Sequence, residues 1–424
     1  MLLIKGGRVI DPASKLDDGR DILIADGRIS AIEKKIEKVG AEIFDASGMV
    51  VAPGFLDLHV HLREPGGEGA ESIATGTRAA AAGGFTAVCS MPNTQPVNDN
   101  AAVTASILSR ARETGVVTVY PVGAASSGSA GEELSSIAAM KRAGIVAVSD
   151  DGRPIANARL MRGVMEYCRT LGLPVIDHCE EPSLFGEGVM HEGAHSTRLG
   201  LRGIPAACEE IPVARNCILA RETGAHIHLA HLSTCGALES VRLAKQRGVR
   251  VTCEVTPHHF TLMDEDIRDY RTCYKMNPPL RGREDRDALV EGIADGTVDA
   301  IATDHAPHHP VAKEVEFDLA PFGVIGLETA LGLALDRLVH TGKISLTRLV
   351  ELFSTHPAKI LGLDRGKIQV AATADLTLFD PAREWTYRVE QSESKSRNSP
   401  FDGWKFRGAP MATIVAGKII YQRK

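Results

Sequence analysis

The stretch Phe55-Leu-Asp-Leu-His-Val-His61 is the part of the sequence from which the fold can be worked out. Successive side chains of a β-strand point to opposite faces, so His59 and His61 point to the same side. Two imidazoles in this relation can bind one metal ion. A pair of this kind is a weak signal alone, but it gains weight at the C-terminal end of a barrel strand, where barrel enzymes carry their chemistry.

Seven further short strand-like stretches follow the first one, and most are separated by stretches that fit a helix. With the first, the strand candidates are 55–61, 86–91, 117–122, 145–149, 174–178, 226–231, 250–255 and 299–303. The helical stretches include 71–82, 101–114, 158–171, 212–223 and 235–247, with two more near 326–341 and 346–353. This alternation predicts the α/β class and a (β/α)8 TIM barrel.

Both ends of the chain differ from this rhythm. Residues 2–12, 21–32 and 41–53 are short alternating strands, and Asp26-Gly27 is a strong hairpin signal, so we expect a small antiparallel β unit there. Strand-like stretches return at 366–380 and 412–421. We therefore expect one small β-sandwich built from residues 1–53 and 366–424, with the barrel formed by residues 54–365.

The composition excludes several classes of protein. Of 424 residues, 44% are hydrophobic and 24% are charged, which allows a large buried core. A net charge of −6 argues against a general binder of nucleic acid or anionic membranes. The start of the chain does not resemble a signal peptide, and no run of apolar residues is long enough to span a membrane. The eight cysteines form no CxxC pair, so we expect reduced thiols in a cytoplasmic protein.

Residues that commonly bind metals recur where the strand candidates end. Five of the eight strands carry them, and the set is His59, His61, Asp151, His178, His231 and Asp304. So many polar groups at one barrel mouth need a partner. Nitrogen and oxygen ligands without a thiolate suit Zn²⁺, with Mn²⁺ or Co²⁺ as substitutes. Six ligands are enough for two ions if one carboxylate bridges them.

Several longer stretches make the chain resemble the dihydroorotases of the longer bacterial class, within the amidohydrolase superfamily. The resemblance covers almost the whole chain, and its first and fifth stretches are the most specific. The matching stretches are Asp57-Leu-His-Val-His-Leu-Arg-Glu-Pro-Gly66, Met91-Pro-Asn-Thr94, Ser149-Asp-Asp-Gly152, Lys275-Met-Asn-Pro-Pro-Leu-Arg281, Ala302-Thr-Asp-His-Ala-Pro-His308 and Lys395-Ser-Arg-Asn-Ser-Pro-Phe401.

The resemblance implies a role for each residue of the site. One zinc ion is held by His59 and His61 and a second by His178 and His231, with Asp151 as the bridge. Asp304 binds metal and shuttles the proton, and a plain ligand role is the alternative. The residues implied in substrate binding are His61, Arg63, Asn93, Asn277, His308 and the backbone of Phe322 and Gly323. The implied reaction is the reversible cyclisation of N-carbamoyl-L-aspartate to (S)-dihydroorotate.

Two other interpretations stay open. A hydantoinase or allantoinase would use a carboxylated lysine as the metal bridge, but no lysine ends the fourth strand and the nearest, Lys141, lies well upstream. A silent subunit that scaffolds aspartate transcarbamoylase would be expected to lose metal ligands, and all six are present. The resemblance leaves open a homodimer and an association with aspartate transcarbamoylase.

The remaining polar residues near these stretches receive structural interpretations. Asp57 is expected to orient a ligand, and Asp150 to act as a structural hydrogen-bond partner. We expect His226 and His228 to be core or surface residues. For His258 and His259, a supporting role for one of them and a purely structural role are equally favoured, and His305 and His309 receive no role.

Overall fold

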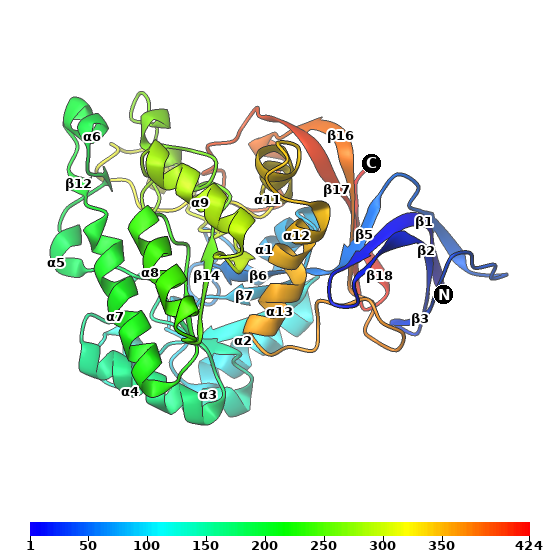
Figure 1. Cartoon of the computed structure of the whole chain (residues 1–424), viewed down its shortest axis with the longest axis horizontal. Helices are drawn as coiled ribbons and strands as arrows, with labels where there is room; N and C mark the ends of the chain where they lie inside the picture. Colours follow the sequence, from blue (N-terminus) through cyan, green and yellow to red (C-terminus); the bar gives the residue numbers. More distant parts are fainter.

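Eight parallel strands form the barrel in the computed structural model, which describes residues 1–424 (Figure 1). Neighbours in the sheet follow one another in the sequence, and the ring is closed because the amide of His61 donates to the carbonyl of His305 at 2.9 Å. All eight strand candidates are confirmed. The strands are β6 (Phe55–Val60), β7 (Phe85–Ser90), β8 (Thr118–Gly123), β9 (Ala147–Val148), β10 (Val175–Asp177), β13 (Ile227–Leu229), β14 (Val251–Val255) and β15 (Ala300–Ile301).

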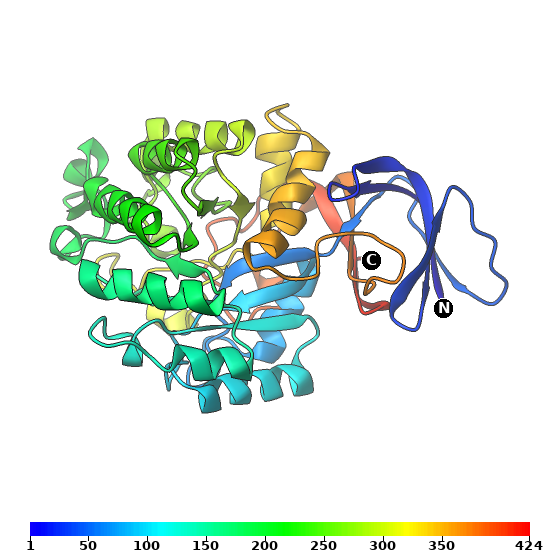
Figure 2. The ribbon, with the colours of Figure 1, turned by 60° about the horizontal axis from the view of Figure 1, so that its bottom comes forward.

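The helices lie outside these strands (Figure 2). Apolar residues between the two layers, such as Leu229, Val241 and Ile293, form the main core. The longer helices are α1 (Ile73–Ala82), α2 (Ala101–Thr114), α3 (Ile137–Ala143), α4 (Ala158–Leu171), α7 (Ala207–Thr223), α8 (Cys235–Gln246) and α9 (Arg283–Asp295). The shorter ones are α5 (Pro182–Phe185), α6 (Ala194–Leu199), α10 (Pro310–Lys313), α11 (Ala330–Ala334), α12 (Leu346–Val350) and α13 (His356–Ile360).

Helix α7 begins five residues earlier than the sequence predicts, so that Pro212 lies inside it. A proline has no N–H to donate, which normally ends or kinks a helix. Here the carbonyl of Cys208, four residues before Pro212, accepts a hydrogen bond from the amide of Glu181 at 2.8 Å. This contact from outside the helix satisfies the carbonyl and lets the helix continue.

Strands from both ends of the chain form a separate mixed sheet beside the barrel, where the two termini also lie (Figure 1). The expectation that both chain ends combine beside the barrel is thus confirmed, in the form of one eight-stranded sheet. Its strand order is β18-β17-β16-β5-β1-β2-β3, with β4 paired to β1. The bounds are β1 (Leu2–Asp11), β2 (Leu16–Ala25), β3 (Arg28–Glu33), β4 (Glu42–Asp45), β5 (Val50–Pro53), β16 (Leu376–Thr386), β17 (Lys405–Val415) and β18 (Lys418–Gln422). A two-stranded sheet, β11 (Met190–His191) and β12 (Gly203–Ile204), lies apart.

The hairpin at Asp26-Gly27 is confirmed, with Ala25 opposite Arg28 and both turn residues at positive φ. The expectation of a wholly antiparallel N-terminal unit is wrong, because β1 pairs in parallel with β4 and β5. After β3 the chain crosses to the other edge of β1, and β5 there leads through Gly54 directly into β6. The entry into the barrel therefore determines the direction of these strands.

All eight cysteines are free thiols, and six of them are buried. No helix is both long and apolar enough to cross a membrane.

Candidate metal and substrate site

The C-terminal ends of the barrel strands bring the six predicted metal ligands together. Two come from β6 and its end, and the others follow β9, β10, β13 and β15. All six are buried, none being more than 7% exposed. The ligand atoms of five of them form two groups that share Asp151, the first with His59 and His61 and the second with His178 and His231. The geometry therefore has the form of two adjoining cation sites.

Distances within the two groups match those expected for ligands of one ion. Asp151 Oδ1 lies 3.2 Å from His59 Nε2, and Asp151 Oδ2 lies 3.4 Å from His61 Nε2. The second group is slightly wider, with Asp151 Oδ1 at 3.7 Å from His178 Nδ1 and from His231 Nε2. With metal–ligand bonds of ~2.0–2.1 Å, tetrahedral donor atoms are about 3.3 Å apart. His59 Nε2 is buried without a hydrogen-bond partner, which also fits a bound cation.

Asp304, the sixth predicted ligand, lies beside the first group but is not part of it. Its Oδ1 lies 3.1 Å from His61 Nε2 and 3.6 Å from His59 Nε2. Burial would raise the pKa of Asp151 and of Asp304, but the neighbouring histidines outweigh burial and hold both pKa values below the usual range. Burial likewise disfavours charge on His59, yet Asp151, Glu254 and Asp304 raise its pKa well above normal. The site is therefore built for positive charge.

Glu254 on β14 is a residue of the site that the sequence interpretation missed. Its side chain is fully buried, with Oε1 3.3 Å from His59 Nδ1 and Oε2 3.0 Å from His228 Nε2. Burial opposes ionisation, but the two histidines lower the pKa of Glu254 to about 2. Of the core and surface positions left open for His228, the structure shows the core one, and His228 Nδ1 also contacts Thr252 Oγ1 at 2.9 Å. A lone acidic residue inside the buried strand Val-Thr-Cys-Glu-Val is the signal that could have identified Glu254.

Three residues of the site adopt a backbone conformation that is unusual for residues other than glycine. The φ angles are 59° for Arg63, 34° for His231 and 44° for Asp304. Such conformations cost on the order of 1–3 kcal/mol each and persist only where the surroundings hold them. All three residues belong to the predicted site, so the local strain coincides with the expected chemistry.

A cavity of about 250 Å³ lies over the two candidate metal-binding groups. It is lined by His61, Arg63, Asn93, Asp151, Gly152, His178, His231, Asn277, Asp304, Ala306, His308, Phe322 and Gly323. All the residues predicted to bind substrate are in this lining. Of the six predicted metal ligands, only His59 is not, because it lies behind Asp151 and Asp304 on the inner side of the site.

The side chains of the lining are held by specific contacts. Arg63 Nε donates to the carbonyl of Pro307 at 3.1 Å, and its two Nη groups have no protein acceptor. Asn93 lies 2.9 Å from His61 Nδ1 and 3.3 Å from Asp151 Oδ2. His308 Nε2 contacts the carbonyl of Phe322 at 2.6 Å. The cavity thus offers a free guanidinium fork at one wall and amide groups beside the metal-binding residues.

Asn277 is held by a second acidic residue that the sequence interpretation missed, Glu180. Asn277 Nδ2 donates to Glu180 Oε2 at 2.6 Å, and the same oxygen lies 3.4 Å from His178 Nε2. Glu180 ends the run His-Cys-Glu after β10, so its position two residues beyond a predicted ligand was the available signal. His259 Nε2 contacts the carbonyl of Pro278 at 2.8 Å and so supports the loop that carries Asn277.

Asp57 and Asp150 have the supporting positions expected for them. Asp57 accepts from the amides of His59 and Thr303 at 3.0 and 3.1 Å, which joins β6 to the end of β15. Asp150 accepts from the amides of Ala125 and Ser126 at 2.8 and 3.1 Å. Both carboxylates therefore fix backbone near the site and do not belong to either metal-binding group.

Known proteins resemble this chain over its full length. A model of the family described as "Dihydro-orotase-like" matches residues 48–237. The dihydroorotase of Solibacter usitatus is 56% identical over 100% of this chain and 98% of its own length, and that of Citrifermentans bemidjiense is 53% identical over 99% of both chains. Among solved structures, the L-hydantoinase of Arthrobacter aurescens is 26% identical with a TM-score of 0.90, covering 99% of this chain and 96% of its own. The D-hydantoinase of a Thermus species is 26% identical with a TM-score of 0.85, covering 100% and 95%.

Proposed function

The chain belongs to the dihydroorotase family, and on this basis we propose that it interconverts N-carbamoyl-L-aspartate and (S)-dihydroorotate, the third step of pyrimidine synthesis. It is a cyclic amide hydrolase that acts on a small molecule, and its family implies a metal. The observation that carries the proposed substrate is the cavity, which combines two adjoining cation sites with one free guanidinium and two side-chain amides.

We propose two zinc ions, the first held by His59 and His61 and the second by His178 and His231, with Asp151 shared between them. When bound, the ions would lower the pKa of a water molecule and polarise the amide carbonyl. Elemental analysis should find two zinc ions per chain, and at most one in Asp151→Ala. A single firmly bound ion in the unaltered protein would contradict the shared carboxylate.

The lining of the cavity suits a substrate that has one carboxylate and a ring of amide groups. The free Nη groups of Arg63 can hold the carboxylate through two parallel hydrogen bonds. Asn93 already contacts His61 and Asp151, so an amide that it holds lies next to the metal-binding groups. Asn277, His308 and the backbone of Phe322 and Gly323 complete the opposite wall.

Asp304 is proposed as the group that moves the proton. Its carboxylate lies at the cavity wall and within 3.6 Å of His59 and His61, so it can reach both the attacking water and the substrate. In ring opening Asp304 takes the proton of the water and returns it to the leaving nitrogen. Ring closure follows the same steps in reverse.

A hydantoinase activity is the second candidate, because the similar solved structures are hydantoinases at 26% identity. No lysine lines the cavity, and Asp151 lies where the two metal-binding groups meet, which favours dihydroorotase. All six predicted ligands lie together, which supports an active enzyme over a silent scaffold. A cytoplasmic location, a homodimer and an association with aspartate transcarbamoylase are further proposals that rest on the family alone.

The purified protein should be assayed for cyclisation of N-carbamoyl-L-aspartate and, in parallel, for hydrolysis of hydantoin and allantoin. We expect turnover of the first compound and little or none of the other two. Preferential hydrolysis of hydantoin or allantoin would overturn the proposed substrate. No turnover of any of the three at full zinc occupancy would favour the scaffold.

A further inference from the structure

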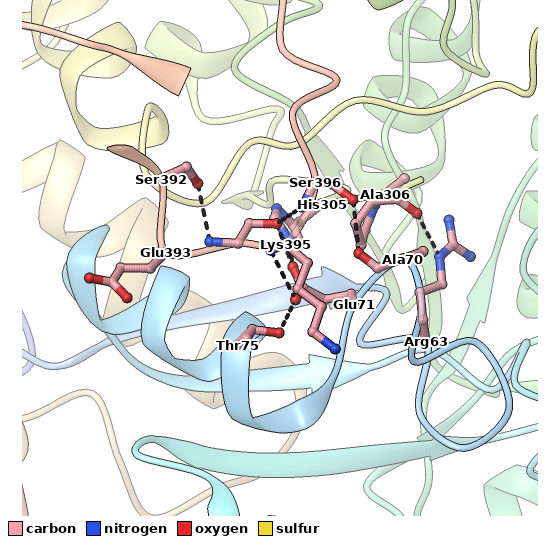
Figure 3. Close-up of polar contacts among 12 residues, drawn as sticks. Arg63, Ala70, Glu71, Thr75, His305, Ala306, Ser392, Glu393, Lys395 and Ser396 are labelled. Atoms are coloured by element: carbon pink, nitrogen blue, oxygen red, sulfur yellow. Dashed lines mark hydrogen bonds and ion pairs between the residues drawn. The ribbon is translucent and has the colours of Figure 1, made fainter. Parts of the chain in front are cut away.

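A segment from the C-terminal part of the chain reaches the loops of the active site. We call residues Ser392–Asn398 the clamp, which lies in the chain between β16 and β17. Part of the clamp belongs to the stretch Lys395-Ser-Arg-Asn-Ser-Pro-Phe401, which neither the metal-binding groups nor the cavity lining includes. Figure 3 shows Lys395 and Ser396 of the clamp beside Glu71 and Ala70, close to Ala306 and Arg63.

The first anchor of the clamp is the start of helix α1. The Ser394 hydroxyl donates to Glu71 Oε2 at 2.5 Å, and the amide of Lys395 donates to Glu71 Oε1 at 3.4 Å. Glu71 is fully buried and also lies 3.4 Å from His305 Nε2. The hydroxyl of Ser396 lies 2.8 Å from the carbonyl of Ala70 and 2.7 Å from that of His308. The clamp therefore joins α1 to the loop that follows β15.

Asn398 is the second anchor, and it joins two loops of the cavity. Its Nδ2 donates to the carbonyls of Ala306 and Gly323 at 2.9 and 3.0 Å. Its Oδ1 accepts from the amide of His308 at 3.4 Å, so both polar ends of the side chain are used. The side chain is only 5% exposed and is not part of the cavity lining.

The two loops approach each other closely at this point. A Cβ on Gly323 would lie 2.8 Å from the Ala306 Cβ and 2.9 Å from His308 Nε2, and Gly323 has a φ of 131°. Only a glycine fits such an approach and such a φ without strain. His308 and Gly323 lie so close together that not even a methyl group fits between them, and both line the cavity. A group that fixes both loops therefore also fixes the shape of this cavity wall.

We propose that Asn398 is a positioning residue, which sets the separation of His308 and Gly323 and thereby the affinity for substrate. This inference rests on the proposed function, since His308 and Gly323 are taken to contact substrate there. Asn398 acts through them and does not touch the substrate. In the proposed function His308 and Gly323 bind the substrate and take no part in its reaction, so losing this amide weakens binding and raises KM.

Two variants of Asn398 test the inference. Asn398→Ala removes the amide, and Asn398→Asp is nearly isosteric but faces two carbonyl oxygens with a carboxylate oxygen. We expect KM for dihydroorotate to rise on the order of 10- to 100-fold in both, with kcat changed far less. The matched control is Asn100→Ala. The side chain of Asn100 also contacts backbone, because its Oδ1 accepts from the amides of Ala102 and Val103 at the start of α2, but it contacts neither of these two loops. A KM in the Asn398 variants equal to that of the control would overturn the inference.

Amide hydrogen exchange gives a second measurement that does not depend on activity. Residues 304–326 should exchange faster in the Asn398 variants, with the barrel strands unchanged. If neither Asn398 variant folds, Ser396→Ala, which removes one hydroxyl of the clamp, should still raise KM several-fold, and an unchanged KM there would overturn the inference. If the unaltered protein does not interconvert the two compounds, the proposed function is wrong. If a folded Asn398 variant shows unchanged exchange at residues 304–326, only the inference about Asn398 is wrong.

Discussion

Glu254 Oε1 lies 3.3 Å from Nδ1 of His59, while Nε2 of the same ring faces Asp151 at 3.2 Å. The ring thus lies between two carboxylates, of which Asp151 is a predicted metal ligand. The other oxygen of Glu254 is fixed by His228, which is itself fully buried. A carboxylate behind a metal-binding histidine fixes the orientation of the ring and makes its free nitrogen a stronger ligand.

Glu254→Gln should therefore weaken metal binding. Glutamine has nearly the same size but no charge, so His59 loses the group that makes it basic. We expect the dissociation constant for zinc, measured by competition with a chelator, to rise about 10- to 100-fold. Glu284→Gln on the exposed side of α9 is the control. Equal zinc affinity in the two variants would show that Glu254 does not support the metal site.

The proton-transfer role of Asp304 can be separated from a plain ligand role by Asp304→Asn. Asparagine can still offer an oxygen to a metal but cannot carry a proton. We expect kcat to fall on the order of 10²- to 10⁴-fold while zinc content stays near normal. The control is Asp287→Asn on the exposed surface of α9. Substantial activity at full zinc occupancy, or recovery on adding zinc, would instead favour the ligand role.

Arg63→Lys should weaken the binding of a substrate that carries a carboxylate. Lysine keeps the positive charge but lacks the two parallel donors. Arginine can donate to the carbonyl of Pro307 through Nε while its two Nη groups hold the carboxylate, and lysine cannot do both. The loss of a charged hydrogen bond costs about 1.5–3 kcal/mol, so KM for dihydroorotate should rise roughly 10- to 100-fold. Arg242→Lys, at an exposed ion pair with Asp295, should leave KM unchanged. An unchanged KM in Arg63→Lys would mean that another group holds the carboxylate.

Glu328 predicts a pH dependence of stability. Burial raises its pKa to about 7, against 4.5 for an exposed glutamate, although Ser392 and the amide of Glu393 partly oppose this. Between these two pH values the folded protein holds a proton that the unfolded chain has lost. The free energy of unfolding should therefore fall as pH rises from about 4.5 to about 7, by about 1–3 kcal/mol from this group, and then level off.

Glu328→Gln should remove this contribution, because glutamine cannot ionise and can still accept from Ser392 and Glu393. The difference in urea midpoint between the variant and the unaltered protein should be more positive at pH 7.5 than at pH 5. With a slope of about 1–3 kcal/mol per M, a change of about 1–3 kcal/mol in the free energy of unfolding shifts the midpoint by about 1 M. Glu239→Gln, at an exposed position of α8, is the control. A pH-independent difference would mean that Glu328 is ionised in the folded protein.

The sequence alone was enough to predict the eight barrel strands and the convergence of six ligands. A strand places its side chains alternately, and parallel strands end at one rim, so residues such as His178 and His231 are predictable from their position in short apolar runs. The direction of β4 and β5 was not predictable, because the pairing of strands at the edge of a sheet depends on how the chain enters the barrel.

The groups that support the site could be found only from the folded chain. Glu254 reaches His59 from another strand, and Asn398 reaches Ala306 and Gly323 from a segment 92 and 75 residues further along the chain. Contacts of this kind leave no periodic pattern in the sequence, since neither partner restricts the identity of its neighbours. The sequence thus determined the barrel and its ligands through local rules of strand geometry, while the supporting carboxylate and the clamp depended on how distant segments pack.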